Sequence, residues 1–176
     1  MLKDILEDLE KAVKSKAYFS ALALALTLPD ICGKIEYNNL DDRGKYIKWF
    51  DEWIYQYLKI PTSKVDAFEK YDELAKFDGE VCYALRCAYL HAGNFELNGN
   101  GKKNIKIDRF ELCVCEGEWQ LGEVHGCSMS NGTITEVHRR LNVENLINCF
   151  ILGTNDYIQK CSDKSDKYGN VNICKI

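Results

Sequence analysis

The stretch Gly79-Glu80-Val81-Cys82-Tyr83-Ala84-Leu85-Arg86-Cys87-Ala88-Tyr89-Leu90-His91-Ala92-Gly93-Asn94 decides how we expect the chain to fold. Small and apolar residues recur in it at the spacing of one face of an α-helix. Those expected to face a core are Val81, Ala84, Leu85, Ala88 and Ala92. Gly93-Asn94 should end the helix, because glycine and asparagine are favoured just past a helix C-terminus.

The opposite side of this predicted helix is also apolar. It carries Tyr83, Cys87 and Leu90, and a helix that is apolar on both faces is generally buried on both. Arg86 and His91 flank that side, about 140° apart if the helix is a regular α-helix. We therefore expect another helix or a second subunit to cover this face, with the arginine and the histidine at the contact.

Length and composition set the broad class of the protein. The 176 residues are enough for one well-packed domain, and 46% hydrophobic with 28% charged residues is ordinary for a globular protein. A net charge of −4 argues against a wide nucleic-acid-binding surface, which needs a strong positive field. It is compatible with a small cleft that holds a few local cations.

The location of the protein can also be predicted from its sequence. The N-terminal segment alternates charged and apolar residues and has no signal-peptide layout. The longest uncharged run, residues 17–29, is too short to span a bilayer. Nine cysteines, an odd number, without a secretory signal are typical of reduced thiols. We expect a cytoplasmic protein with no membrane partner.

The first half of the chain has the periodicity of helices. Pro29 should kink or end a nearly all-apolar central helix, with a short second piece over residues 30–37. Asp78 is placed to cap the helix that starts at Gly79. Aromatic residues of the predicted helix over 45–58 share one face, which favours packing over base stacking. The predicted helices cover residues 2–14, 17–28, 45–58, 66–77 and 79–92.

The pattern changes after Gly93. Residues 103–115 alternate as a strand does, and Glu116-Gly117 should turn the chain back. Asn131-Gly132 is a strong hairpin signal and should join a strand over 124–129 to one over 134–140. These features predict a small antiparallel β-meander.

A last helix follows the strands. It should run from Val143 to about Cys161, with Asn142 as its cap. The expected fold class is α+β, mainly α, in which a helical bundle carries a small appended antiparallel meander and a C-terminal helix. We predict one domain over 1–176, made of a bundle over 1–95, strands over 103–140 and a helix over 142–161.

Two groups of possible metal ligands occur in the predicted strands. Cys113-Val114-Cys115 and His125-Gly126-Cys127 each place two possible metal ligands on one face of a strand. Their spacing matches no common zinc signature and the sequence contains no CxxC, so we expect no metal and no cofactor. A turn at Asn131-Gly132 would place His125 directly opposite His138. We interpret that pair as part of a polar surface.

The residues Arg86-Cys87-Ala88-Tyr89-Leu90-His91 resemble the R-x4–6-H motif of the HEPN superfamily of compact helical bundles. The resemblance covers about residues 1–95. It implies that two protomers pack with their motifs facing, so that a homodimer forms one composite, metal-independent endoribonuclease site, often in a toxin or in phage defence. His91 would move the proton of a ribose 2′-OH, and Arg86 would hold the phosphate. The products would be a 2′,3′-cyclic phosphate and a 5′-hydroxyl.

The same resemblance leaves two functions open. Some family members cleave single-stranded RNA, whereas others bind nucleotides or partner proteins without cleaving anything. Cys87 occupies a position that is often Asn or Asp in the family. An antitoxin would be a further partner of a toxin. Lys102 and Lys103 follow the motif and are candidates for RNA phosphate contacts, or alternatively lysines that protect a strand edge.

Overall fold

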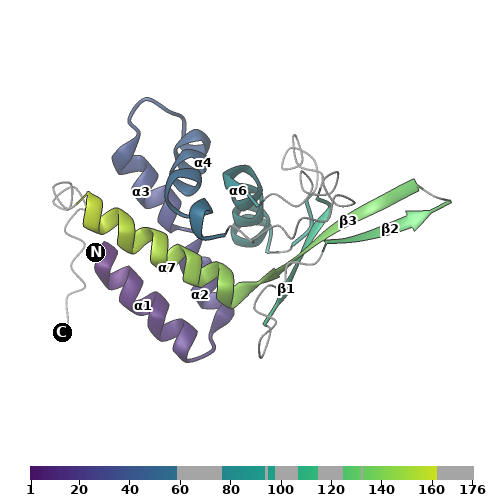
Figure 1. The fold of residues 1–176 in the computed structure, drawn as a ribbon, viewed down its shortest axis with the longest axis horizontal. Coiled ribbons are helices and arrows are strands. Elements are labelled where there is room, and N and C mark those ends of the chain that lie inside the picture. The colour runs from purple at the N-terminus through teal and green to yellow at the C-terminus, as the bar shows by residue number, and fades with distance from the viewer. Residues whose placement is uncertain (59–76, 94, 98–106, 115–124, 132, 162–176) are drawn as a thin grey trace.

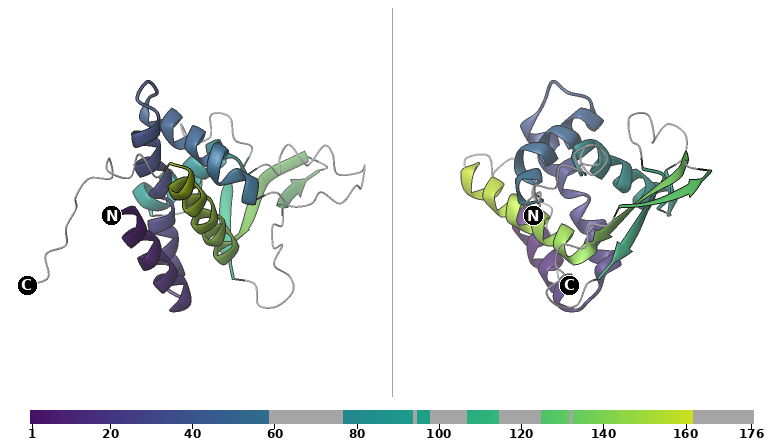
Figure 2. Two further views of the ribbon diagram at one scale, coloured as in Figure 1. Left: turned by 60° about the vertical axis from the view of Figure 1, so that its left-hand side comes forward. Right: turned by 45° about the vertical axis from the view of Figure 1, so that its right-hand side comes forward.

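The computed structural model describes residues 1–58, 77–93, 95–97, 107–114, 125–131 and 133–161. The helices and turns are α1 (Leu2–Lys14), α2 (Tyr18–Ala25), α3 (Leu28–Glu36), α4 (Asp42–Trp53), η1 (Tyr55–Tyr57), α6 (Gly79–Cys87), η3 (Ala88–Ala92) and α7 (Val143–Lys160). The strands are β1 (Arg109–Cys113), β2 (His125–Ser130) and β3 (Thr133–Asn142). The helices gather on one side, and the hairpin of β2 and β3 projects from them (Figures 1 and 2). The chain is mainly helical, with a small sheet and a C-terminal helix.

Local sequence signals explain where the N-terminal helices begin and end. The helix α1 has the predicted bounds. The next helix ends at Ala25, and Pro29 lies in the first turn of α3, where a proline costs no hydrogen bond. The Asp41 carboxylate caps α4 by accepting a hydrogen bond from the Gly44 N–H at 2.8 Å. As a result, α4 starts three residues before the predicted Lys45.

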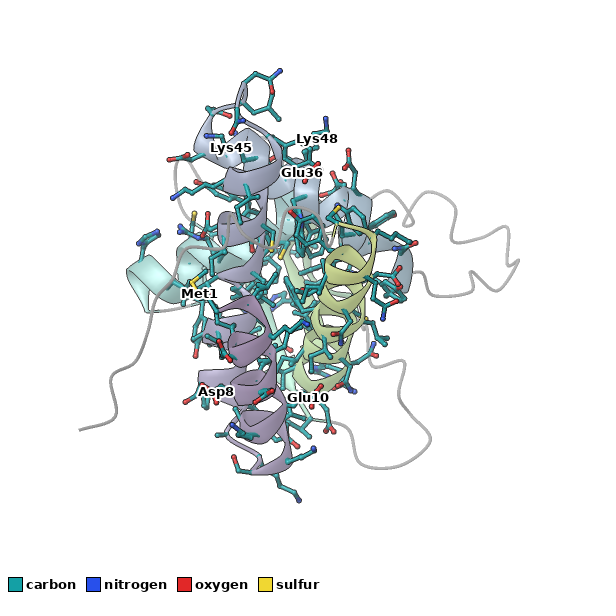
Figure 3. The ribbon with its side chains drawn as sticks, turned by 90° about the vertical axis from the view of Figure 1, so that its left-hand side faces the viewer. Met1, Asp8, Glu10, Glu36, Lys45 and Lys48 are labelled. Atoms are coloured by element: carbon teal, nitrogen blue, oxygen red, sulfur yellow. The ribbon has the colours of Figure 1, made fainter. Side chains whose placement is uncertain are left out.

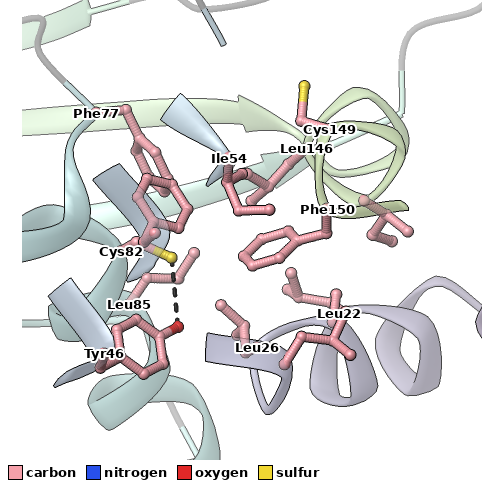
Figure 4. Packing of buried hydrophobic residues seen from close by; sticks show 14 of the residues in the cluster. Leu22, Leu26, Tyr46, Ile54, Phe77, Cys82, Leu85, Leu146, Cys149 and Phe150 are labelled. Carbon is pink, nitrogen blue, oxygen red and sulfur yellow. Dashed lines mark hydrogen bonds between the residues drawn. The ribbon is translucent and has the colours of Figure 1, made fainter. Parts of the chain in front are cut away.

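The interior of the bundle is closely packed around α2, α4 and α7. Leu22 of α2 and Leu26, directly after this helix, are fully buried and lie beside Phe150 of α7 (Figure 4). Trp49 and Phe50 of α4 are also fully buried, so the prediction that the aromatic face of this helix packs in the core is confirmed. Charged side chains of α1, such as Asp8 and Glu10, lie on the outside (Figure 3).

The helices α2 and α3 together form the most apolar part of the bundle. The run Tyr18–Glu36 is long and apolar enough to cross a membrane by length and composition alone. Leu22, Leu28 and Cys32 within it are fully buried by the rest of the protein. Burial of this kind is what the core helix of a packed bundle requires, so the run is weak evidence for a membrane span.

The sheet differs from the predicted antiparallel meander. Its strand order is β1-β3-β2, with β2 antiparallel and β1 parallel to the central strand β3. Two long-range hydrogen bonds fix this order. The Asp108 N–H donates to the Val137 carbonyl at 2.8 Å, and the Val137 N–H donates to the Asp108 side-chain carboxylate at 2.7 Å. The first strand therefore joins the far edge of β3, and the antiparallel pair of this sheet is the predicted hairpin.

The hairpin also has a shifted register. Ser130 pairs with Thr133 at the turn, but an irregularity between Ser128 and Met129 moves the partners beyond it by one residue. His125 is opposite Arg139 instead of His138, so the predicted histidine pair is wrong. A β-bulge is the physical reason, because it sets two residues of one strand against one of the other.

Several predicted features lie outside the described residues. They are most of the helix over 66–77, the start of the strand over 103–115, the return after Glu116-Gly117, and Lys102 with Lys103. At the C-terminus, the Asn142 side chain caps α7 by accepting hydrogen bonds from the N–H groups of Glu144 and Asn145 at 3.2 and 3.3 Å. The predicted cap and C-terminal helix are therefore confirmed.

Candidate functional site

The helix α6 that carries Arg86 is held against α4 at its first residue. The Asp78 carboxylate caps it by accepting the Val81 N–H at 3.2 Å, as predicted. The Gly79 N–H donates to the Asp51 carboxylate at 2.7 Å. Gly79 also lies against the α4 backbone, since a Cβ there would come within 2.5 Å of the Ile47 carbonyl oxygen. Only glycine permits this close approach.

The end of the same helix is wider than a regular α-helix. Residues Ala88–Ala92 form a π-helical turn, and the Gly93 N–H donates to the carbonyl of Ala88, five residues earlier. Gly93 has φ +64°, a left-handed conformation that suits glycine, and the predicted helix stop is confirmed. Ala92 is exposed, so the prediction that it faces the core is wrong.

The π-helical turn brings Arg86 and His91 together. In a regular α-helix they would be about 140° apart, but a turn with i→i+5 hydrogen bonds places residue i+5 close to residue i. Nη1 of Arg86 lies 2.5 Å from Nε2 of His91. The expected angular separation is therefore wrong, and the two motif residues are in direct contact.

Asp30 of α3 anchors the arginine. The Nε and Nη2 atoms of Arg86 both donate to one oxygen of the Asp30 carboxylate, at 3.0 and 2.8 Å. The side chains of Arg86 and Asp30 are 19% and 21% exposed, so solvent screens this ion pair only in part. Burial is the largest influence on the pKa of Arg86 and would lower it, but the charge of Asp30, its hydrogen bond and the neighbouring Cys87 together outweigh burial, so the pKa is raised.

Sequence reasoning missed Asp30, although a signal for it exists. It is the one charged residue between Ala17 and Gly33. A carboxylate within such an apolar run requires a partner when the run is buried. The partner, Arg86, is 56 residues away in sequence, and its position depends on how α3 packs against the other helices.

The second apolar face of α6 is covered in part by α4 of the same chain. The ring of Tyr83 meets the ring of Tyr46 edge to face, with centroids 5.3 Å apart. The guanidinium groups of Arg43 and Arg86 each lie 5.8 Å from the Tyr83 ring centroid. Burial and the neighbouring Cys87 raise the pKa of Tyr83, while Arg86 opposes this shift. Of the two partners expected for this face, another helix is the one that covers Tyr83.

His91 completes the site at its exposed end. Its side chain is exposed, whereas the adjoining Arg86 is mostly covered. An imidazole can accept or donate a proton near neutral pH, and a guanidinium binds phosphate or carboxylate oxygens. The arrangement therefore combines a solvent-accessible proton carrier with a cation whose position is set by Asp30.

The cysteine and histidine groups of the strands form a different arrangement. Within the described residues, no group of three or more His, Cys, Asp or Glu side chains could hold a metal ion. The Cys113 thiol donates to the Leu141 carbonyl at 3.4 Å. His138 is buried beside Glu111 and Glu136, which corrects its expected place on a polar surface. Cys115 lies outside the described residues.

Comparison with known proteins does not supply a family for the chain. No protein-family model, no curated protein and no solved structure matches it. The resemblance to the HEPN superfamily therefore depends on Arg86, His91 and the helical bundle that carries them.

Proposed function

We propose that the chain is a HEPN-like, metal-independent endoribonuclease that cleaves single-stranded RNA at Arg86 and His91. The observation that supports this proposal best is the direct contact between an exposed imidazole and an anchored guanidinium. Attack of a ribose 2′-OH on the adjacent phosphate requires a proton acceptor and a cation within reach of that phosphate. The two side chains have these properties, and their contact brings them within reach of the same group.

The reaction would begin at His91. Its neutral imidazole would take the proton of the 2′-OH, and the 2′-oxygen would then attack the adjacent phosphorus. Arg86 would stabilise the negative charge that develops on the phosphoryl oxygens. The bond to the 5′-oxygen breaks, and that oxygen takes a proton from the protonated His91 of a second copy of the chain. The products are a 2′,3′-cyclic phosphate and a 5′-hydroxyl.

The ion pair with Asp30 would orient Arg86 for this role. Two of the three guanidinium nitrogens donate to Asp30, and Nη1 is the nitrogen next to His91. A phosphate oxygen would therefore meet Nη1 beside the imidazole. Fixing a cation before the substrate arrives lowers the reorganisation needed in the transition state.

A non-catalytic module that binds a nucleotide or a partner protein is the second candidate. Two observations favour it: Asp30 already neutralises the Arg86 charge in the free chain, and Cys87 follows the arginine where a polar residue is common in the resembled family. A binder of this kind would use the same two side chains for an anion without transferring a proton.

Cleavage of single-stranded RNA in the presence of EDTA tests the proposal. We expect His91→Ala to reduce the cleavage rate by about 10²- to 10⁴-fold, the usual contribution of a general acid or base. His138→Ala is the matched control and should retain cleavage, because that histidine belongs to the sheet. Cleavage that stops on chelation, or survives His91→Ala, would contradict the mechanism. Binding without cleavage by the wild type would support the second candidate.

A further inference from the structure

Phe19 on the first turn of α2 is an aromatic residue whose side chain is not part of the core. It is 68% exposed, the highest value for a large apolar side chain among the described residues. Its neighbour Tyr18 is packed against the core, but the Phe19 ring is left at the surface. Exposed aromatic rings near a functional site are common elements of ligand recognition.

Two more aromatic residues connect Phe19 to the candidate site. The Tyr89 hydroxyl donates to the backbone carbonyl of Phe19 at 2.9 Å. The Tyr89 ring stacks on Phe95, with centroids 5.3 Å apart and planes 12° from parallel. Tyr89 belongs to the π-helical turn and stands between Arg86 and His91 in sequence. Phe19, Tyr89 and Phe95 are here called the aromatic platform, and Tyr89 joins Phe19 to the turn that carries His91.

We infer that the aromatic platform binds an unstacked nucleobase of single-stranded RNA while Arg86 holds a nearby phosphate. This inference rests on the proposed function and adds where the bases of the substrate would bind. Every base has a flat π-face, so stacking on aromatic rings is favourable and tolerant of sequence. Three residues of helix, about 5 Å of rise, separate Tyr89 from Arg86. Phe19 lies farther from Arg86, because it precedes Asp30 by eleven residues. A single strand of a few nucleotides would extend from Arg86 past Tyr89 to Phe19.

Charge favours this ligand over an uncharged one. Two groups near Tyr89 in sequence can carry a positive charge: the Arg86 guanidinium, which is paired with Asp30, and the His91 imidazole when it is protonated. They suit a ligand that offers both flat rings and anionic groups, as a single strand of RNA does. The platform also fits the small site expected for a chain of net charge −4, because base stacking adds affinity without further positive charge.

Affinity measurements on the full-length chain, with a base-bearing strand and an abasic strand, test the inference. The probes are a labelled 2′-O-methyl oligoadenylate, which lacks the 2′-OH needed for cleavage, and the same strand with abasic sites, which keeps every phosphate. We expect Phe19→Ala to weaken binding of the base-bearing strand by about 5- to 150-fold. Binding of the abasic strand should not change. Phe19→Trp should preserve the difference between the strands, since it keeps an aromatic ring.

Leu152→Ala is the matched control, because Leu152 is an exposed apolar residue on α7. Equal losses on the two strands after Phe19→Ala would overturn the inference, as would no binding by the wild type. A shift of the Phe19→Ala variant to a lower mass in sedimentation, without a base-dependent loss, would also overturn it and assign the platform to contact with a second copy.

The test is independent of cleavage. Base-dependent binding together with no cleavage of unmodified RNA would support the platform and contradict the ribonuclease. Cleavage of unmodified RNA by a protein that binds the base-bearing and abasic strands equally would support the ribonuclease and contradict the platform. The two proposals can therefore fail separately.

Discussion

Two arginine–histidine pairs occur in the described parts of the molecule, one in the helical bundle and one on the sheet. In the bundle, Arg86 contacts His91, and the nearby carboxylate of Asp30 binds the arginine. On the sheet, Arg109 donates a hydrogen bond to Nδ1 of His138. Residues of β1 and β3 supply the groups around His138, so the sheet pair joins two strands.

The positions of the carboxylates distinguish the two pairs. Nδ1 of His138 lies 3.5 Å from Glu111, and its Nε2 lies 3.2 Å from Glu136. Both nitrogens of that ring are thus occupied by neighbouring protein groups, and the residue is buried. His91 is exposed. The same two residue types therefore form a buried contact between strands in the sheet and an accessible site in the bundle.

Gly79→Ala should have the largest effect and should disturb the bundle pair alone. The added Cβ would lie 2.5 Å from the Ile47 carbonyl oxygen and 2.9 Å from its Cα. These backbone atoms cannot move aside easily, so we expect the free energy of unfolding to fall by about 3 kcal/mol, the upper part of the usual range for overpacking. Urea unfolding measures the loss. Amide chemical shifts should change at Arg86 and stay constant at His138.

Gly93→Ala is the matched control for that substitution. No atom lies within 4 Å of an added Cβ there, and only the positive φ opposes it. The expected loss is about 1–2 kcal/mol. If Gly79→Ala costs no more than Gly93→Ala, the close contact between α6 and α4 does not position the site.

Asp30→Ala should have the next largest effect. It leaves the Arg86 guanidinium mostly buried without its carboxylate, which we expect to lower the free energy of unfolding by about 2 kcal/mol, since partial exposure reduces the cost of breaking a buried pair. Glu136→Ala on the sheet is the control. That carboxylate is 41% exposed, so the loss should be below about 1 kcal/mol. Equal losses in urea unfolding would remove the distinction between the two pairs.

Much of the bundle follows from local sequence signals. Asp78 and Asn142 were recognisable as caps because a carboxylate or amide oxygen satisfies N–H groups within three residues of it. Gly93 ends its helix through its own backbone conformation. Such signals act over one turn, and the sequence displays them in full.

The features that were missed depend on distant parts of the chain or on small changes in backbone hydrogen bonding. The partner of Arg86 is set by the way α3 and α6 both pack against α4, and the parallel pairing of β1 with β3 joins segments about 29 residues apart. The π-helical turn shifts one hydrogen-bond register and leaves no distinctive residue pattern. The same is true of the bulge near Ser128, which altered the partner of His125.

Glu111→Gln should have the smallest effect and should depend on pH. Hydrogen bonds from Arg140, at 3.0 and 3.2 Å, and then the charges of Arg140, Arg109 and His138 lower the pKa of Glu111. A carboxylate with a lowered pKa stabilises the folded state above its ordinary pKa, and this contribution is lost as the pH falls through the lowered value. The variant should therefore be less stable than the wild type near pH 5, and the difference should shrink as the pH falls towards 3.

Urea unfolding at these two pH values measures the difference, with Glu10→Gln on the exposed side of α1 as the control. A deficit that persists unchanged near pH 3 would mean that Glu111 contributes through the shape of its side chain and not through its charge. The contact around His138 on the sheet would then depend on packing and not on charge. The difference in carboxylate charges would no longer distinguish it from the Arg86–His91 pair.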